Sequence, residues 1–99
     1  MADLQCPATA VLLDEAADPP PWLKDLRIAR RFTARDSRSV VSLVDETADL
    51  YRGETFVVAA PSPAVEEALR YRGISASAPL VIEIDSDGWG RPASDAGRR

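Results

Sequence analysis

Residues 53–73, GETFVVAAPSPAVEEALRYRG, decide the fold of this chain, because they predict a strand, a tight turn and a helix in succession. The run over residues 55–60 is short, rich in β-branched residues and free of charge, which is typical of a strand covered on both faces. Pro61 ends this strand because it has no N–H to donate to a ladder. Ser62 and Pro63 are expected as the N-cap and the first residue of the helix. The sheet is therefore expected to be built outward from this interior strand.

Two other strands are predicted on either side of this unit. Residues 8–13 form an apolar run that ends at an acidic pair, and residues 80–85 form a run that alternates weakly. Gly73 is expected to end the intervening helix in the left-handed conformation. Residues 85–88 predict a turn, after which Trp89 is expected to cover the edge of the sheet.

Two helices are predicted between the first two strands. A helix over residues 22–32 places apolar side chains on one stripe and arginines on another. A second helix is expected to begin with Asp36 or Ser37 as its N-cap and to run to about Tyr51. Together with the strands, these helices indicate a chain whose elements alternate, as in α/β proteins.

We therefore predict a small α/β domain of two or three layers, with a mostly parallel sheet of about three strands and two to three helices. The domain is expected over residues 1–89, and a disordered tail over residues 90–99, which are rich in Gly, Arg, Pro and Asp. A sheet of three strands leaves open edges, so a homodimer is expected.

Composition argues against several functions. The chain has no histidine, so it lacks the commonest general base and the usual nitrogen ligand of metals. The single cysteine, Cys6, allows no intramolecular disulfide and is expected to be a small hydrophobic residue near a strand. We expect no metal site and no cofactor. The net charge of -4 argues against binding to nucleic acid or anionic membranes, and the lack of a long apolar run or a signal peptide predicts a cytoplasmic protein.

Arginines are concentrated in one part of an otherwise acidic chain. They crowd into twelve residues, at Arg27, Arg30, Arg31, Arg35 and Arg38. This asymmetry predicts a site for a protein partner, and the alternative is a solvated helix face.

Acidic residues follow the first predicted strand, at the kind of strand end where α/β proteins place ligand-binding groups. These residues are Asp14 and Glu15, and because neighbours on a strand point to opposite faces they are poorly placed to act as a pair. An alternative function is a small enzyme or ligand-binding protein that uses these acids. In that case Ser62 is the only other candidate side chain near a strand end.

Three stretches resemble the histidine phosphatase superfamily: residues 9–16 (TAVLLDEA), residues 48–60 (ADLYRGETFVVAA) and residues 81–89 (VIEIDSDGW). The first is similar to the strand that runs into the Arg-His-Gly motif of that family, and the second to the helix and strand before its second His-Gly. The resemblance implies an α/β phosphatase fold with a phosphorylated histidine.

The chain departs from this family where the chemistry occurs. Asp14 and Glu15 stand where the family has Arg-His, and Pro61 and Ser62 stand where it has the second His-Gly. Acidic side chains repel phosphate, and neither pair supplies the histidine nucleophile. The resemblance therefore implies a shortened, inactive relative with a degenerate pocket at these four residues.

Residues 57–74 (VVAAPSPAVEEALRYRGI) are also similar to the closing strand and helix of STAS domains, the class of anti-sigma-factor antagonists. Asp36 and Ser37 resemble the phosphorylatable Asp-Ser of that class. In this interpretation phosphorylation of Ser37 adds negative charge at a helix N-terminus that docks on a partner, whereas an N-cap is the alternative role of Ser37.

These observations predict a non-catalytic protein-interaction or regulatory domain. The STAS-like switch at Ser37 and the small enzyme or ligand-binding protein remain the alternatives.

Overall fold

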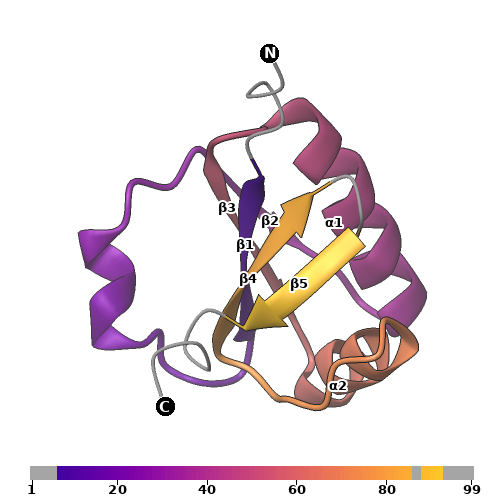
Figure 1. Cartoon of the computed structure of the whole chain (residues 1–99). Helices are drawn as coiled ribbons and strands as arrows, with labels where there is room; N and C mark the ends of the chain where they lie inside the picture. Colours follow the sequence, from indigo (N-terminus) through magenta and orange to yellow (C-terminus); the bar gives the residue numbers. More distant parts are fainter. Residues whose placement is uncertain (1–6, 86–87, 93–99) are drawn as a thin grey trace.

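The structure is a computed structural model that describes residues 7–85 and 88–92 (Figure 1). In chain order its elements are β1 (Ala8–Asp14), the 3-10 helix η2 (Pro21–Asp25), β2 (Arg30–Thr33), α1 (Ser37–Leu50), β3 (Thr55–Ala60), α2 (Ser62–Tyr71), β4 (Leu80–Asp85) and β5 (Gly88–Pro92). The α/β class is confirmed. Cys6 lies outside the described residues.

The strands form one mixed sheet of five, in the order β2-β3-β1-β4-β5. β1 pairs in parallel with β3, which pairs in parallel with β2, whereas β4 and β5 continue the sheet in antiparallel pairs. The predicted interior position of residues 55–60 is confirmed. The prediction of about three mostly parallel strands is wrong, because β2 overlaps the end of the predicted helix, β5 extends into the predicted tail, and β4 and β5 pair antiparallel.

The predicted helix over residues 22–32 does not form. Only Pro21–Asp25 turns into a 3-10 helix, and Arg30–Thr33 becomes a strand beside β3. Phe32 explains this preference, because as a strand residue it meets Phe56 edge to face with ring centroids 6.5 Å apart. Packing of this side chain against the core outweighs the weak helical periodicity.

The tail was predicted to begin at residue 90, but residues 90–92 belong to β5, so that part of the prediction is wrong. These residues pair with β4, which offers them the backbone groups of an open edge. Residues 93–99 lie outside the described residues.

The helix ends agree largely with the predictions. Asp36 is the N-cap of α1 and accepts a hydrogen bond from the backbone N–H of Ser39 at 2.8 Å. Gly73 ends α2 with φ +79°, and Ile74 donates its N–H to the carbonyl of Leu69 at 2.8 Å. The predicted N-cap at Ser62 is wrong, because Ser62 is the first helical residue and Pro61 precedes it without a side-chain cap.

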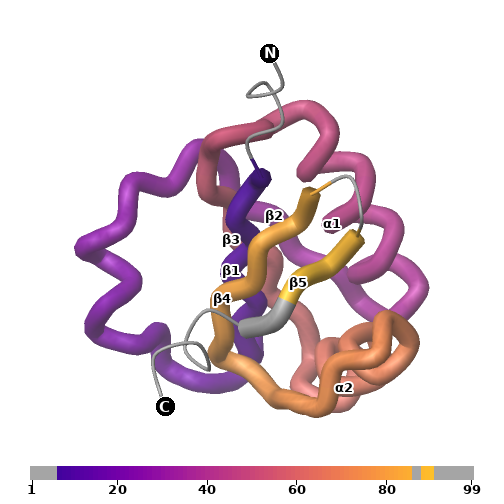
Figure 2. The backbone as a smooth tube through the Cα atoms, in the orientation of Figure 1, coloured from indigo at the N-terminus to yellow at the C-terminus, as the bar shows by residue number. Residues whose placement is uncertain are grey.

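Both α-helices cover one face of the sheet (Figures 1 and 2). The main core lies between them and alternate strand residues such as Leu12, Phe56 and Val58, which are fully buried. The opposite face carries a smaller cluster in which Leu23 of η2 packs on Val11 and Val57. The connection between β1 and β2 is therefore the main cover of this second face.

Polar contacts connect strand β5 to the helices. The indole N–H of Trp89 donates to Asp45 Oδ1 of α1 at 2.7 Å, and the guanidinium of Arg72 binds Asp45 Oδ2. The Arg72 guanidinium also lies 5.6 Å from the centre of the Trp89 ring. Trp89 packs on the main core, which confirms that it covers the edge of the sheet.

Candidate functional site

Strand β2 is an edge of the sheet, and no strand pairs with its outer side in the described part of the chain. The N–H of Ala34, the residue after β2, donates to the carbonyl of Ala59 in β3 at 2.9 Å. Because backbone groups alternate between the two sides of a strand, Arg30 and Phe32 direct theirs to β3, and the N–H and C=O groups of Arg31 and Thr33 point toward the open side. These groups are available to hydrogen-bond with an extended segment of another chain.

The predicted arginine site is divided between the two faces of the sheet. The guanidinium of Arg30 lies 5.7 Å from the ring centre of Phe32, on the helix side. Arg31, the next residue, lies on the opposite face, where it lines a hollow. Both are exposed, and neither forms an ion pair with any of the described residues. They therefore flank the open side of β2 from above and below.

The other three arginines extend this basic region along the chain. Arg27 precedes β2, Arg35 follows it, and Arg38 lies in the first turn of α1; all three are exposed. Asp36 lies among them, and its hydrogen bond from the Ser39 backbone, assisted by the charges of Arg38 and Arg35, lowers the pKa of its carboxyl. We call the open side of β2 with its flanking arginines the basic edge.

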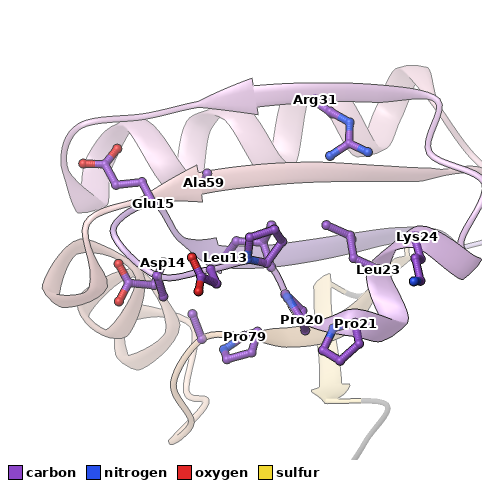
Figure 3. A pocket seen from close by; sticks show the side chains of 14 residues that line it. Leu13, Asp14, Glu15, Pro20, Pro21, Leu23, Lys24, Arg31, Ala59 and Pro79 are labelled. Atoms are coloured by element: carbon purple, nitrogen blue, oxygen red, sulfur yellow. The ribbon is translucent and has the colours of Figure 1, made fainter.

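A hollow of about 570 Å³ opens at the carboxyl ends of β1 and β3, on the face away from the α-helices. Its wall is largely apolar and includes Leu13, Pro20, Leu23, Ala59 and Pro79. Figure 3 shows these side chains between two charged ends. A volume of this size is in the range of pockets that hold small molecules.

The two ends of this hollow carry opposite charges. Asp14 and Glu15 lie at one end, and Lys24 and Arg31 at the other (Figure 3). One oxygen of Asp14 accepts a hydrogen bond from the backbone N–H of Ala16 at 3.0 Å, which fixes the carboxylate at the end of β1. We call this cavity the switch hollow, because the connections that follow β1 and β3 leave the sheet on opposite faces beside it.

The four residues predicted as a degenerate pocket meet only in part. Asp14 faces Ala60 in the strand register, so Glu15 and Pro61 follow neighbouring strands. Pro61 and Ser62 do not line the switch hollow, because α2 begins there and turns toward the other face. The carboxylates of Asp14 and Glu15 do not face each other in Figure 3.

Ser37 lies elsewhere, at the first residue of α1. It is half-buried and lines a second hollow of about 740 Å³ between α1 and α2, together with Arg38 and Arg70. Sequence analysis found Ser37 and Arg38 but did not predict that the end of α2 brings Arg70 to the same hollow.

Other kinds of site find no support in the described residues. No group of three or more His, Cys, Asp or Glu side chains there is placed to hold a metal ion. No helix in this part of the chain is long and apolar enough to cross a membrane. Comparisons with protein-family models, with curated proteins and with solved structures find no match to this chain. The histidine phosphatase and STAS relationships therefore remain predictions.

Proposed function

We propose that this chain is a non-catalytic protein-interaction domain, resembling an inactive histidine phosphatase, that binds an acidic, extended segment of a partner protein along its basic edge. The observation that carries this proposal is an unpaired edge strand flanked by exposed arginines on both faces of the sheet. An extended segment can add to such an edge through main-chain hydrogen bonds. Acidic side chains on it meet Arg30 and Arg31.

Charge also decides between a partner protein and a second copy at this edge. Symmetric pairing of two β2 strands brings the arginines of both copies together, and like charges opposite each other destabilise a strand pair. The homodimer expected from the sequence is therefore proposed to pair through the other edge strand, β5. This leaves the basic edge free for the acidic partner.

The proposal is tested by affinity capture from native cell extract with three forms of the chain. The wild type is compared with Arg30→Glu/Arg31→Glu and with the control Arg98→Glu/Arg99→Glu, which has the same net charge. A partner retained by the wild type and the control, but lost with Arg30→Glu/Arg31→Glu, supports the proposal. Equal recovery with all three forms refutes the placement on β2.

A phosphorylation switch at Ser37 is the second candidate function. The observation that favours it is the position of Ser37 at the start of α1, beside Arg38 and Arg70 in the second hollow. A phosphate there gains from the helix dipole and from the arginines. The Ser37→Asp form is expected to alter partner capture. Ser42→Asp, which changes another serine of the same hollow, is the control. If the two variants capture the partner equally well, the phosphorylation switch at Ser37 is refuted.

A further inference from the structure

We infer that the switch hollow binds a small zwitterion with an apolar body, of the kind that a short apolar peptide presents. This inference does not rest on the proposed protein partner, although Arg31 belongs to both the basic edge and the hollow. It rests on the topology of β1 and β3, on the apolar wall of the hollow and on the separation of opposite charges at its ends.

Topology places a crevice at this point of the sheet. β1 and β3 are neighbouring parallel strands, but the connection after β1 crosses the face covered by η2, whereas α2 follows β3 onto the helix face. Where the connections of two such strands diverge, ligands of α/β proteins bind outside the carboxyl ends. The switch hollow is lined by the last residues of both strands, Leu13 and Ala59 among them.

The wall of the hollow favours an apolar ligand body. Pro20, Pro21 and Pro79 present rings without backbone donors, and Leu13 and Leu23 add aliphatic side chains to the wall. Leu23 is held in place because it is buried on Val11 and Val57. Apolar surface that a ligand covers here is removed from water, which favours binding.

The charged ends select the polar groups of the ligand. Arg31 makes no ion pair within the described residues, so its guanidinium has donors available for a carboxylate. Asp14 and Glu15, at the other end, attract an ammonium group and repel an anion. A molecule that carries only one charge satisfies one end and leaves the other without a partner.

The test uses the tripeptide Ala-Leu-Leu in three forms: with free termini, with an acetylated N-terminus and with an amidated C-terminus. Binding is measured by titration of the amide NMR spectrum of the whole chain. Each blocked form is expected to bind about fivefold more weakly than the free form, because it loses one exposed ion pair. The shifts are expected at the ends of β1 and β3.

Two variants assign the ends of the hollow. Arg31→Gln is expected to weaken binding of the free peptide about fivefold and to leave binding of the amidated form unchanged. Asp14→Asn is expected to weaken binding of the free peptide about fivefold and to leave binding of the acetylated form unchanged. Arg30→Gln is the matched control, since the neighbouring side chain lies on the other face. Equal binding of the three peptides, an effect of only one terminus, or an equal effect of Arg30→Gln and Arg31→Gln overturns the inference.

Discussion

Replacement of two neighbouring valines by alanine tests the division of the core between the faces of the sheet. Val57 and Val58 are both buried in β3, with 3% and 0% of their surface exposed. Val58 faces the main core beneath the α-helices, and Val57 faces the small cluster under η2. The chemistry of the two substitutions is the same, so any difference reports on the cover of each face.

The structure gives the order and the size of the two effects. Each substitution removes two carbon groups from a buried site, which costs about 1.6 kcal/mol in transfer free energy. A cavity term adds to this cost where the surroundings cannot collapse. Beneath two packed helices we expect Val58→Ala to cost about 2–3 kcal/mol, whereas the irregular cover of Val57 relaxes and leaves the transfer cost of about 1.6 kcal/mol.

The free energies of unfolding are measured by urea denaturation of the wild type and both variants. In heating experiments each kcal/mol corresponds to a Tm change of about 4–8 °C for a domain of this size. Unchanged m-values establish that the same structure unfolds in each case. A Val57→Ala variant that is destabilised as much as Val58→Ala, or more, refutes the assignment of the main core to the helix face.

Three further predictions concern the helix ends and the attachment of β5. Asp36→Ala is expected to lower the stability at neutral pH, and Asp36→Asn is expected to lower it much less. Because folding lowers the pKa of the Asp36 carboxyl, its contribution to stability is present above the usual pKa of 3.8 and is lost as the pH falls below that value. Thermal melts of the wild type and both variants at a series of pH values check this. Asp45→Ala is expected to cost about 1 kcal/mol in urea denaturation, because it removes the partner of the Trp89 indole N–H, and the change in Trp89 fluorescence reports the same loss. Gly73→Ala is expected to cost about 1–2 kcal/mol in the same assay through its backbone conformation alone, since φ is +79° and a Cβ there meets no atom within 4 Å.

The sequence predicts the parts of the fold that depend on local chemistry. Residues 55–60 have the composition of an interior strand, and Asp36 and Gly73 mark helix ends by their own hydrogen-bonding and backbone properties. These features need few distant contacts to be specified. They are also the features that the structure confirms.

Strand β2 shows why other parts were missed. Residues 31–35 alternate polar and apolar side chains, which is a strand signal, but the segment is short and the arginines also fit a helical stripe. Only the contact of Phe32 with Phe56, from a distant part of the chain, decides between the two. β5 was missed for a similar reason, because its pairing partner, not its composition, makes it a strand.

The candidate sites, like the fold, were predicted only where local sequence specifies them. Sequence analysis selected the acidic residues at the end of β1 and the arginines, but it did not place Arg31 in the same hollow as Asp14, because that requires β2 to be a strand. The opposite faces of Arg30 and Arg31 were likewise hidden by the predicted helix. Once the strand is known, the alternation of its side chains gives both placements.

The central claim is that a partner segment adds to the open side of β2, and amide hydrogen exchange of the chain in the captured complex tests it most directly. The N–H groups of Arg31 and Thr33 are expected to exchange rapidly in the free chain and to become protected in the complex, because they gain hydrogen-bond acceptors there. Protection that leaves Arg31 and Thr33 unchanged and appears instead along α1 and α2 contradicts the claim.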